Sequence, residues 1–380
     1  MRLTMPRDQL LLAGVTALTL FGLLMVYSAS MAVGAQKGEP SYFFVRQFLY
    51  AGIGYLAMIV LMLIDYHIWL KLKVFVPLAA IVVLCLMLVF TRQTVNGSHR
   101  SLGLVPLVSF QPSEAAKLVF LFYLAYFLHK HRDQIFRPGR RMIECLTVVA
   151  LFGVLIGLEP DLGQAVCIFS ITAILFFVAG LNWKYIGSTV LVSLPLFYFF
   201  VWNVSFRRRR IYDWLNALAD PLSAHYQIKH AAIALGSGGL LGVGLGESVQ
   251  KFFFLPEAQS DFIYSIIGEE FGLAGTLLIG CAFLGYLYLG IKISANAPDA
   301  GGFYLGLGIT VMIALQALIN ISTAVSIMPT KGLTLPFISQ GGSSLVVCLM
   351  ASGILLNIAS DKHMKNIPAA FPIVPESAER

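Results

Sequence analysis

The chain carries little charge for its length, and this scarcity bounds its class. Only 12% of its 380 residues are Asp, Glu, Lys or Arg, while 58% are hydrophobic, and the mean hydropathy is +0.81. Soluble domains use charged residues for about a quarter of their length, so a soluble fold is excluded and an integral membrane protein is indicated. No polar stretch is long enough for a separate soluble domain, so we expect one membrane domain over residues 1–380.

Metal and nucleotide motifs are also missing. The five cysteines are scattered, with no CxxC pair and no Cys/His spacing suited to zinc, so we interpret them as packing residues. The glycine run GSGGLLGVGLG (236–246) fails the dinucleotide fingerprint, which requires glycine where Leu241 stands. Its glycines are expected either to allow close backbone packing or to expose N–H groups to a ligand. The net charge of +7 does not indicate nucleic acid, because Lys and Arg in a membrane protein mostly record its orientation.

Long apolar runs dominate what is present. A span needs about 17–25 mostly apolar residues, and the first run, which follows Arg2 and Arg7, is too long for a signal peptide and lacks its cleavage site. The basic loops 65–73 and 129–141 are expected to be cytoplasmic, which puts both termini on the cytoplasmic side. The sequence predicts an all-α polytopic protein with ten spans, at 9–31, 43–64, 74–91, 113–129, 142–158, 162–180, 184–203, 262–290, 303–327 and 342–360.

The segment 204–261 is predicted to be a large extracytoplasmic loop between the seventh and eighth spans. It contains four consecutive arginines, Arg207, Arg208, Arg209 and Arg210. Two interpretations stay open. The side chains either reach the lipid headgroups from the end of a span, or they bind an anionic ligand such as a phosphate or diphosphate, which guanidinium groups grip in a bidentate manner.

Two further segments on the same side are unusual. Residues 96–118 are too apolar for a solvated loop and too broken for a span, so we expect a partly buried or re-entrant segment. It ends in QPSE, which predicts a helix start with Glu114 and Lys117 paired one turn apart. In the segment 328–345, Lys331 is the only ionisable residue. It is expected either to anchor the chain at the membrane interface or to line a cavity.

The stretch LPEAQSDFIYSIIGEEFG (255–272) holds four carboxylates at the start of a membrane span. Glu269 and Glu270 lie about two turns into the span, where an ionisable group is costly and is expected to be functional or paired. Asp261 lies at the membrane–water junction just before the helix. It suits a helix N-cap and equally suits a catalytic carboxylate, and the residues alone leave both roles open.

Several motifs together resemble one family. They are, in chain order, MVYSAS (25–30), FFVRQ (43–47), QPSE (111–114), EPDLG (159–163), GVGLGESVQK (242–251), LPEAQSDF (255–262) and PTKGLTLPFIS (329–339). In this order they resemble the SEDS family (shape, elongation, division and sporulation), the FtsW/RodA-type peptidoglycan glycosyltransferases. The run GVGLGESVQK followed by LPEA is more similar to the FtsW division branch than to the elongation branch.

The resemblance implies ten spans and polymerisation of lipid II into glycan strands at the outer face of the bacterial cytoplasmic membrane, for septal wall synthesis in division. It also implies a class B penicillin-binding protein as transpeptidase partner, together with other proteins of the division complex and no nucleic acid. The essential aspartate of the family falls on Asp261.

The implied chemistry assigns roles to the charged residues. A sugar hydroxyl is a poor nucleophile, so Asp261 is expected to act as general base, and cations stabilise the diphosphate that leaves as an anion. The expected substrate-binding cations are Arg207, Arg208, Arg209, Arg210 and Lys331, with Arg100 and Arg46 as further candidates. The residues expected to give structural support are Glu114, Lys117, Glu269 and Glu270. No ligand set identifies a metal, and a divalent cation on the diphosphate is the one cofactor left open.

The chain departs from the family pattern at a few positions. Gln259 and Ser260 stand where His-Thr is frequent, Ser101 where an aromatic residue is frequent, and Gln340 where tyrosine is usual. These departures concern substrate positioning, since Asp261 itself is retained. Two other functions stay open: a lipid II flippase, and a non-catalytic scaffold for the transpeptidase. Neither needs an indispensable aspartate in the outer loop.

Overall fold

The computed structural model describes residues 6–91, 102–105, 108–131, 139–158, 162–185, 205–219 and 226–360, with a few single positions between 187 and 202. Its helices are α1 (Arg7–Gln36), α2 (Tyr42–Leu63), α3 (Leu72–Thr91), α4 (Pro112–Lys130), α6 (Arg140–Leu158), α7 (Leu162–Val178), α9 (Ser205–Ala219), α10 (Tyr226–Ser237), α11 (Ile263–Ala295), α12 (Ala300–Ala324) and α13 (Gly342–Ser360). A short 3-10 turn, η1 (Tyr66–Ile68), follows α2, and an antiparallel pair of strands, β1 (Leu102–Val105) and β2 (Val108–Phe110), precedes α4.

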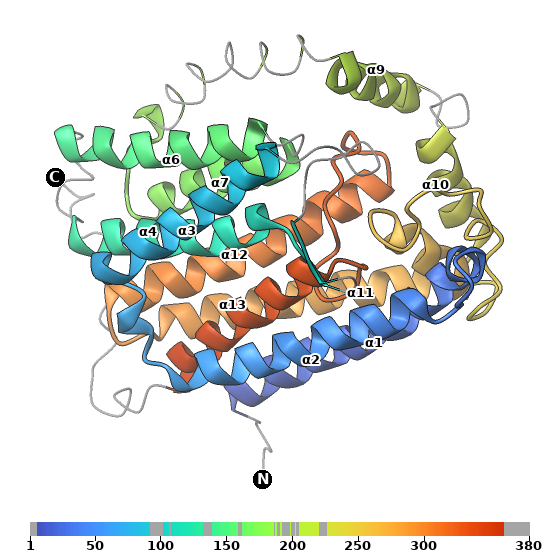
Figure 1. The fold of residues 1–380 in the computed structure, drawn as a ribbon, viewed down its shortest axis with the longest axis horizontal. Helices are drawn as coiled ribbons and strands as arrows, with labels where there is room; N and C mark the ends of the chain where they lie inside the picture. The colour runs from blue at the N-terminus through green and yellow to red at the C-terminus, as the bar shows by residue number, and fades with distance from the viewer. Residues whose placement is uncertain are drawn as a thin grey trace, which may run out of the picture.

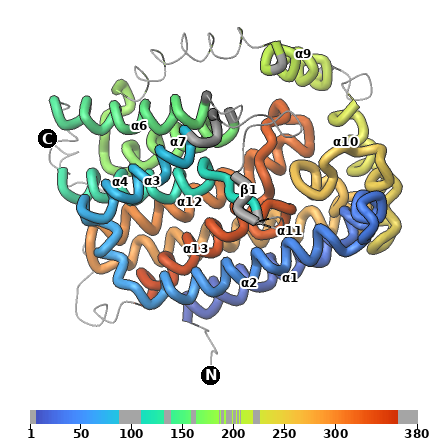
Figure 2. The backbone as a smooth tube through the Cα atoms, viewed as in Figure 1, coloured from blue at the N-terminus to red at the C-terminus, as the bar shows by residue number. Residues whose placement is uncertain are grey.

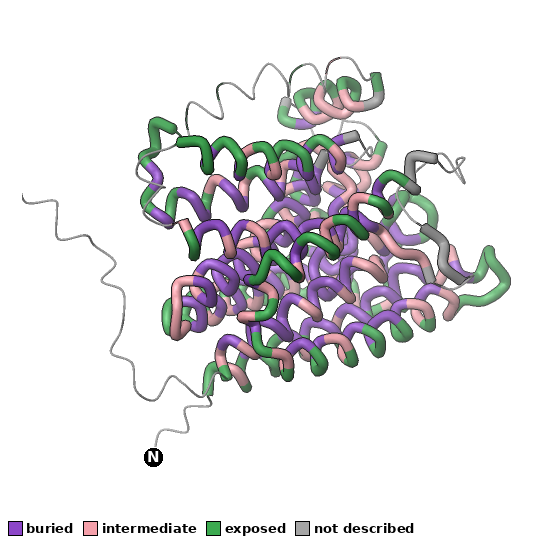
Figure 3. The backbone as a smooth tube through the Cα atoms, turned by 60° about the vertical axis from the view of Figure 1, so that its left-hand side comes forward, coloured by how far each residue is buried: buried purple, intermediate pink, exposed green. Residues whose placement is uncertain are grey.

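The long helices lie side by side with roughly aligned axes (Figures 1 and 2). α12 contacts α4, α7, α11 and α13, while α13 also contacts α1 and α2. These two helices therefore form the middle of the bundle, and the buried residues concentrate there while the outer helices carry the exposed ones (Figure 3). The loops that carry the motifs before α11 and before α13 meet at the end of the bundle where α1 ends and α2 begins (Figure 1).

The outer helices expose large apolar side chains. On α2, Leu56 and Leu63 are 66% and 75% exposed, and on α11, Leu278 and Leu284 are 67% and 65% exposed. Soluble proteins rarely expose apolar surface on this scale, whereas hydrocarbon solvates it without cost. Five helices among the described residues are long and apolar enough to cross a membrane: α1, α2, α11, α12 and α13.

Most of the predicted spans coincide with helices. Each predicted run except 184–203 overlaps one helix, although α3, α4, α6 and α7 are not among the five clear spans. The run 184–203 falls almost entirely outside the described residues. The predicted loop 204–261 holds two helices, α9 and α10. In the segment 96–118 the structure places the β1–β2 hairpin and the start of α4.

α11 is broken near its first third, which the sequence did not predict. Gly272 has φ 64° and ψ −160°, so the helix is interrupted there. The loop between α10 and α11 fills the break with backbone hydrogen bonds. Val243 N–H and Gly244 N–H donate to the carbonyls of Glu269 and Glu270 at 3.0 Å each. The glycine loop thus replaces the hydrogen bonds that the interrupted helix cannot make.

Two glycines make this contact sterically feasible. A Cβ on Gly238 would collide with the backbone carbonyl of Gly268, and a Cβ on Gly242 would collide with that of Glu270. Gly242 also has φ 81°, in the left-handed region that favours glycine. Of the two roles expected for the glycine run, close backbone packing is therefore the one that these positions serve.

Candidate functional site

Asp261 lies in a tight turn immediately before α11. The N–H groups of Ser260 and Asp261 both donate to the carbonyl of Glu257 at 3.1 Å, and Glu257 has φ 57°. The N-cap position of α11 is occupied by Phe262, and no side chain caps the helix there. Asp261 precedes the cap, so the helix-cap interpretation of this residue is wrong. Its side chain is half-buried at the end of the bundle.

The loop between α12 and α13 holds this turn in place. Asn320, buried in α12, donates from its amide nitrogen to the carbonyl of Asp261 at 3.0 Å and to the carbonyl of Leu333 at 2.6 Å. Ser339 Oγ donates to the carbonyl of Ser260 at 2.6 Å. One buried amide thus joins the backbone at Asp261 to the backbone two residues after Lys331, and the two predicted site segments come together.

Lys331 is the cation of this loop. It is half-buried, and within the described ranges its ammonium group makes no hydrogen bond or ion pair. Burial lowers the pKa of Lys331 from its usual 10.5, because taking the charged form out of water costs free energy. A partly dehydrated ammonium group is suited to an anionic ligand.

The arginine run divides into two pairs. On α9, Arg210 donates at 3.1 Å to the carbonyl of Thr330, the residue before Lys331. Arg207 donates to the carbonyl of Gly157 at 2.9 Å. Arg208 and Arg209 are exposed. The spacing of Arg207 and Arg210 puts them on one face of the helix. The structure therefore brings Arg210 to the Lys331 loop, whereas Arg208 and Arg209 face outward.

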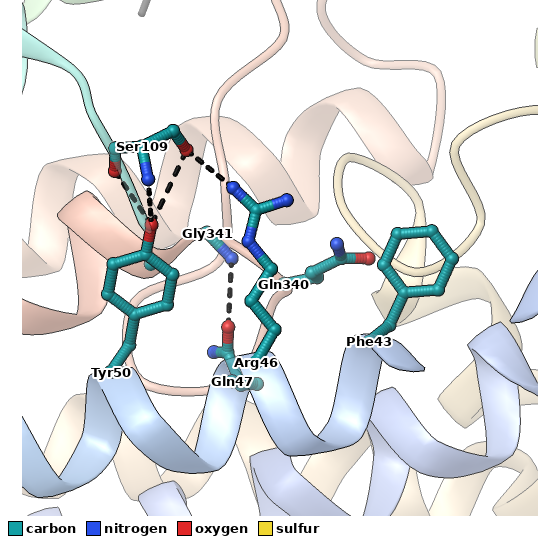
Figure 4. Close-up of a pocket in the computed structure, with 8 residues that line it drawn as sticks. Phe43, Arg46, Gln47, Tyr50, Ser109, Gln340 and Gly341 are labelled. Atoms are coloured by element: carbon teal, nitrogen blue, oxygen red, sulfur yellow. Dashed lines mark hydrogen bonds between the residues drawn. The ribbon is translucent and has the colours of Figure 1, made fainter. Parts of the chain in front are cut away.

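A polar pocket of about 160 Å³ lies between α2, β2 and the loop before α13 (Figure 4). Arg46 on α2 points into it and donates to Ser109 Oγ at 2.8 Å. Gln340 forms part of the wall, and its N–H donates to the carbonyl of Gln259 at 2.9 Å, two residues before Asp261. The full lining is Phe43, Arg46, Gln47, Tyr50, Ser109, Gln340, Gly341 and Gly342.

Arg46 thus reaches the same region as Asp261 through the strand β2 and the loop before α13. Two positions where the chain departs from the family pattern, Gln259 and Gln340, are joined by this backbone hydrogen bond. Arg100, a further candidate cation, and Ser101, another departure from the family pattern, fall outside the described residues.

Glu114 and Lys117 form a buried ion pair in the first turns of α4. Lys117 Nζ lies 2.9 Å from Glu114 Oε2, with both side chains at most 3% exposed. Lys117 also donates to Gln316 Oε1 at 2.7 Å, and Gln316 Nε2 donates to the carbonyl of Thr334 at 3.0 Å. The network therefore connects α4 and α12 to Thr334, which lies three residues after Lys331 in the loop before α13.

Glu269 and Glu270 hold the loop that precedes Asp261. Glu269 Oε1 accepts from Val249 N–H at 3.0 Å and Glu269 Oε2 accepts from Ser248 Oγ at 2.5 Å. Glu270 Oε1 lies 2.9 Å from Lys251 Nζ, with both side chains at most 1% exposed. Both glutamates are turned into the protein and attach the segment 248–251 to α11.

Some residues of this region were not singled out from the sequence. Asn320 and Gln316 lie inside an apolar run, where an amide gives no distinctive signal. Lys251 belongs to the GVGLGESVQK motif, but only the structure shows that it faces Glu270. Among the described residues, no three His, Cys, Asp or Glu side chains come together that could hold a metal ion.

Comparison with known proteins gives consistent relatives. The profile of the FtsW/RodA/SpoVE family, described as "Cell cycle protein", matches residues 8–364. The chain is 40% identical to the probable peptidoglycan glycosyltransferase FtsW of Geobacter metallireducens, over 95% of this chain and 96% of the relative. It is also 40% identical to stage V sporulation protein E of Bacillus subtilis, over 92% of this chain and 96% of that protein.

Solved structures agree with these relatives. A chain of a peptidoglycan synthase complex that coordinates polymerization and crosslinking is similar, with a TM-score of 0.71, 25% identity and coverage of 93% of this chain and 97% of that chain. The rod shape determining protein RodA of Thermus thermophilus is similar with a TM-score of 0.66 and 25% identity, covering 93% of this chain and 96% of that chain.

Proposed function

Because the chain belongs to the FtsW/RodA/SpoVE family of cell cycle proteins, we propose that it is a peptidoglycan glycosyltransferase that polymerises lipid II into glycan strands. It is an integral membrane protein, and its 40% identity to FtsW-named relatives over almost its whole length supports a role in division. The observation that carries the proposal is the junction at Asn320, which joins the Asp261 turn to the loop of Lys331. A carboxylate and a dehydrated cation are what this reaction requires.

The reaction transfers a glycan from a lipid diphosphate to a sugar hydroxyl. The 4-hydroxyl oxygen of the acceptor sugar attacks the anomeric carbon of the donor, and the bond from that carbon to the diphosphate oxygen breaks. The hydroxyl proton passes to the Asp261 carboxylate, acting as general base. Attack from the face opposite the diphosphate inverts the anomeric configuration.

The leaving group decides what else the site needs. A glycosidase uses a second carboxylic acid to protonate its leaving oxygen, but a diphosphate leaves as an anion and is stabilised by cations. Arg210 reaches the loop of Lys331, and Arg46 lines the polar pocket whose wall is bonded to Gln259; these three cations are the ones we propose to bind the lipid diphosphates of the two substrates. Arg207, Arg208, Arg209 and Arg100 are the further cations of the proposal.

The buried ion pairs support this site without contacting substrate. Glu114 and Lys117 reach the loop of Lys331 through Gln316. Glu269 and Glu270 attach the segment that leads to Asp261. We assign all four a positioning role, because catalytic groups must be held within a fraction of an ångström of their working geometry.

The location and the partner belong to the same proposal. We place the protein in the bacterial cytoplasmic membrane with ten spans, both termini in the cytoplasm and Asp261 at the outer face, at the division septum. A class B penicillin-binding protein is the proposed partner, since a structurally similar chain belongs to a complex that combines polymerization and crosslinking. Other division proteins and a divalent cation carried by the substrate diphosphate are further elements of the proposal.

The test is polymer formation from purified lipid II by the protein with its transpeptidase, whose crosslinking is blocked by a β-lactam. Wild-type protein should give glycan ladders, and a folded Asp261→Asn variant should lose at least about 100-fold in rate. Equal ladders from both would remove Asp261 from the chemistry. Absence of ladders from both, with lipid II transport across vesicles intact, would favour a flippase. Absence of both activities would favour a scaffold.

A further inference from the structure

The segment between α10 and α11 exposes an apolar ridge. From Leu241 to Val249 every second residue is exposed, and Leu241 is 82% exposed. The glycines between them are partly buried, and a Cβ on Gly242 would meet the backbone of Glu270 on α11. The exposed apolar side chains of this segment are Leu240, Leu241, Val243, Leu245, Val249, Phe252, Phe253 and Phe254. A soluble loop would present the opposite pattern, because water favours the polar face outward.

The cation of this segment is buried. The segment 240–254 contains two charged residues, of which Glu247 is exposed and Lys251 is not. Lys251 is turned inward, is 2% exposed and pairs with Glu270 at 2.9 Å. Turning the cation into the protein while phenylalanines point outward is costly in water, and it is favourable where the outer environment is apolar.

The backbone of the ridge is also prepared for an apolar environment. Its inner edge exchanges hydrogen bonds with both sides of the break in α11. Leu273 N–H donates to the carbonyl of Gly239 at 2.9 Å, and Ala274 N–H donates to the carbonyl of Leu240 at 3.1 Å. Irregular backbone is tolerated at membrane depth only where its polar groups have partners. The contact with α11 provides such partners for Gly239, Leu240, Val243 and Gly244 through its backbone and for Val249 through Glu269.

The position of the ridge along α11 fixes its depth. Leu240 lies beside Leu273, from which the exposed strip of α11 continues through Leu277 and Leu278, at 58% and 67% exposure. From Gly272 to Lys292 the helix rises about 30 Å, at about 1.5 Å per residue, which is the thickness of the hydrocarbon core. The break and the ridge therefore coincide with the boundary between hydrocarbon and headgroups.

We propose that residues 240–254 form a wedge that inserts into the membrane leaflet on the side of Asp261. The occupant of its apolar face is lipid, because the face continues the lipid-facing strip of α11 at the depth where that helix leaves the hydrocarbon. Amphipathic segments bind at this boundary with their apolar side among the acyl chains.

The wedge determines the depth of the candidate site. Asp261 follows Phe254 by seven residues. The chain around this stretch is held on both sides, since Lys251 pairs with Glu270 and the carbonyl of Asp261 accepts from Asn320. In the part of this inference that rests on the proposed function, the wedge keeps the carboxylate at the headgroup level, where the sugar of a lipid-linked substrate lies.

Nitroxide accessibility tests the wedge without any substrate. Single cysteines at Leu241 and Leu245, in a background with the native cysteines replaced, are spin-labelled, and the protein alone is placed in phosphatidylethanolamine–phosphatidylglycerol nanodiscs. Both positions are exposed, so the labels do not disturb the core. A label at Leu278 reports the lipid-facing reference, and a label at exposed Glu39 reports water.

The expected result is that oxygen reaches the labels at Leu241 and Leu245 while a water-soluble nickel chelate is excluded, as at Leu278. Access of the nickel chelate equal to that at Glu39 would overturn the proposal in favour of a solvated loop. Exclusion of both reagents would overturn it in favour of a face covered by protein, such as a second copy. Since lipid II is not present, failure here leaves the glycosyltransferase proposal intact, and the reverse also holds.

Discussion

Removing the ammonium group of Lys251 should destabilise the protein strongly. Lys251 and Glu270 are paired at 2.9 Å, and both side chains are at most 1% exposed. In a Lys251→Met variant the apolar stem keeps much of its volume, but among the described residues Glu270 then retains only the Ser28 hydroxyl, at 2.7 Å, as a donor. A buried charge that loses its partner costs about 3–5 kcal/mol. We expect that loss in the free energy of unfolding, measured by dodecyl sulfate titration with tryptophan fluorescence.

Two further variants separate charge from volume. A double variant, Lys251→Met with Glu270→Gln, removes both charges and should recover most of the loss, because the uncompensated carboxylate is gone. Arg140→Met serves as a matched control, since its pair with Glu144 is 93% and 56% exposed and exposed pairs contribute little. A Lys251→Met protein as stable as the wild type would refute the reasoning, since it would mean that Glu270 carries no buried charge.

Three other predictions follow from the contacts around the site. Burial lowers the pKa of Lys331 from 10.5, so the rate of polymerisation should begin to fall below pH 10.5 as the pH is raised, and Lys331→Arg should move this fall to higher pH. The free energy of unfolding should increase with pH between the lowered pKa and 10.5, because the unfolded chain keeps this proton to higher pH than the folded protein does. Gly242→Ala should abolish the folded state that Gly246→Ala retains, as judged by gel filtration, since both have positive φ but only a Cβ at Gly242 meets backbone; equal yields would contradict the contact. Asn320→Ala should lower kcat about 10- to 100-fold with KM little changed, measured from initial rates of glycan formation, and an unchanged kcat would show that the amide does not position Asp261.

The membrane class, the helices and the site segments could be predicted because their signals are local. Apolar runs of span length record burial in hydrocarbon directly, and the predicted run 262–290 lies within α11 apart from its first residue, the N-cap Phe262. The chain-order motifs indicated that the Asp261 and Lys331 segments act together. Their junction could not be predicted, since it depends on Asn320, an amide in an apolar run that gives no sign of the two carbonyls it contacts.

The break in α11 shows a second limit. Glycine inside a helical pattern is usually tolerated, so Gly272 alone does not predict an interruption. The interruption exists because the loop 238–246 supplies hydrogen bonds to both sides of it. The loop and α11 determine each other's backbone conformation through these contacts, so the conformation of neither segment can be predicted from its own sequence. The β1–β2 hairpin was missed for a related reason, because a re-entrant segment and a short hairpin share the same apolar, broken composition.

The four carboxylates between residues 255 and 272 differ in what surrounds them, and that difference decides which can act as a base. Glu269 and Glu270 are at most 2% exposed and are engaged by backbone N–H groups and an ammonium group, so no substrate hydroxyl can reach them. Glu257 is exposed and accepts from Ser260 within its own turn, so little fixes its position relative to a substrate. Asp261 is half-buried in a turn whose carbonyl is fixed by a buried amide. A general base must be both reachable and immobile, and of these four only Asp261 combines the two.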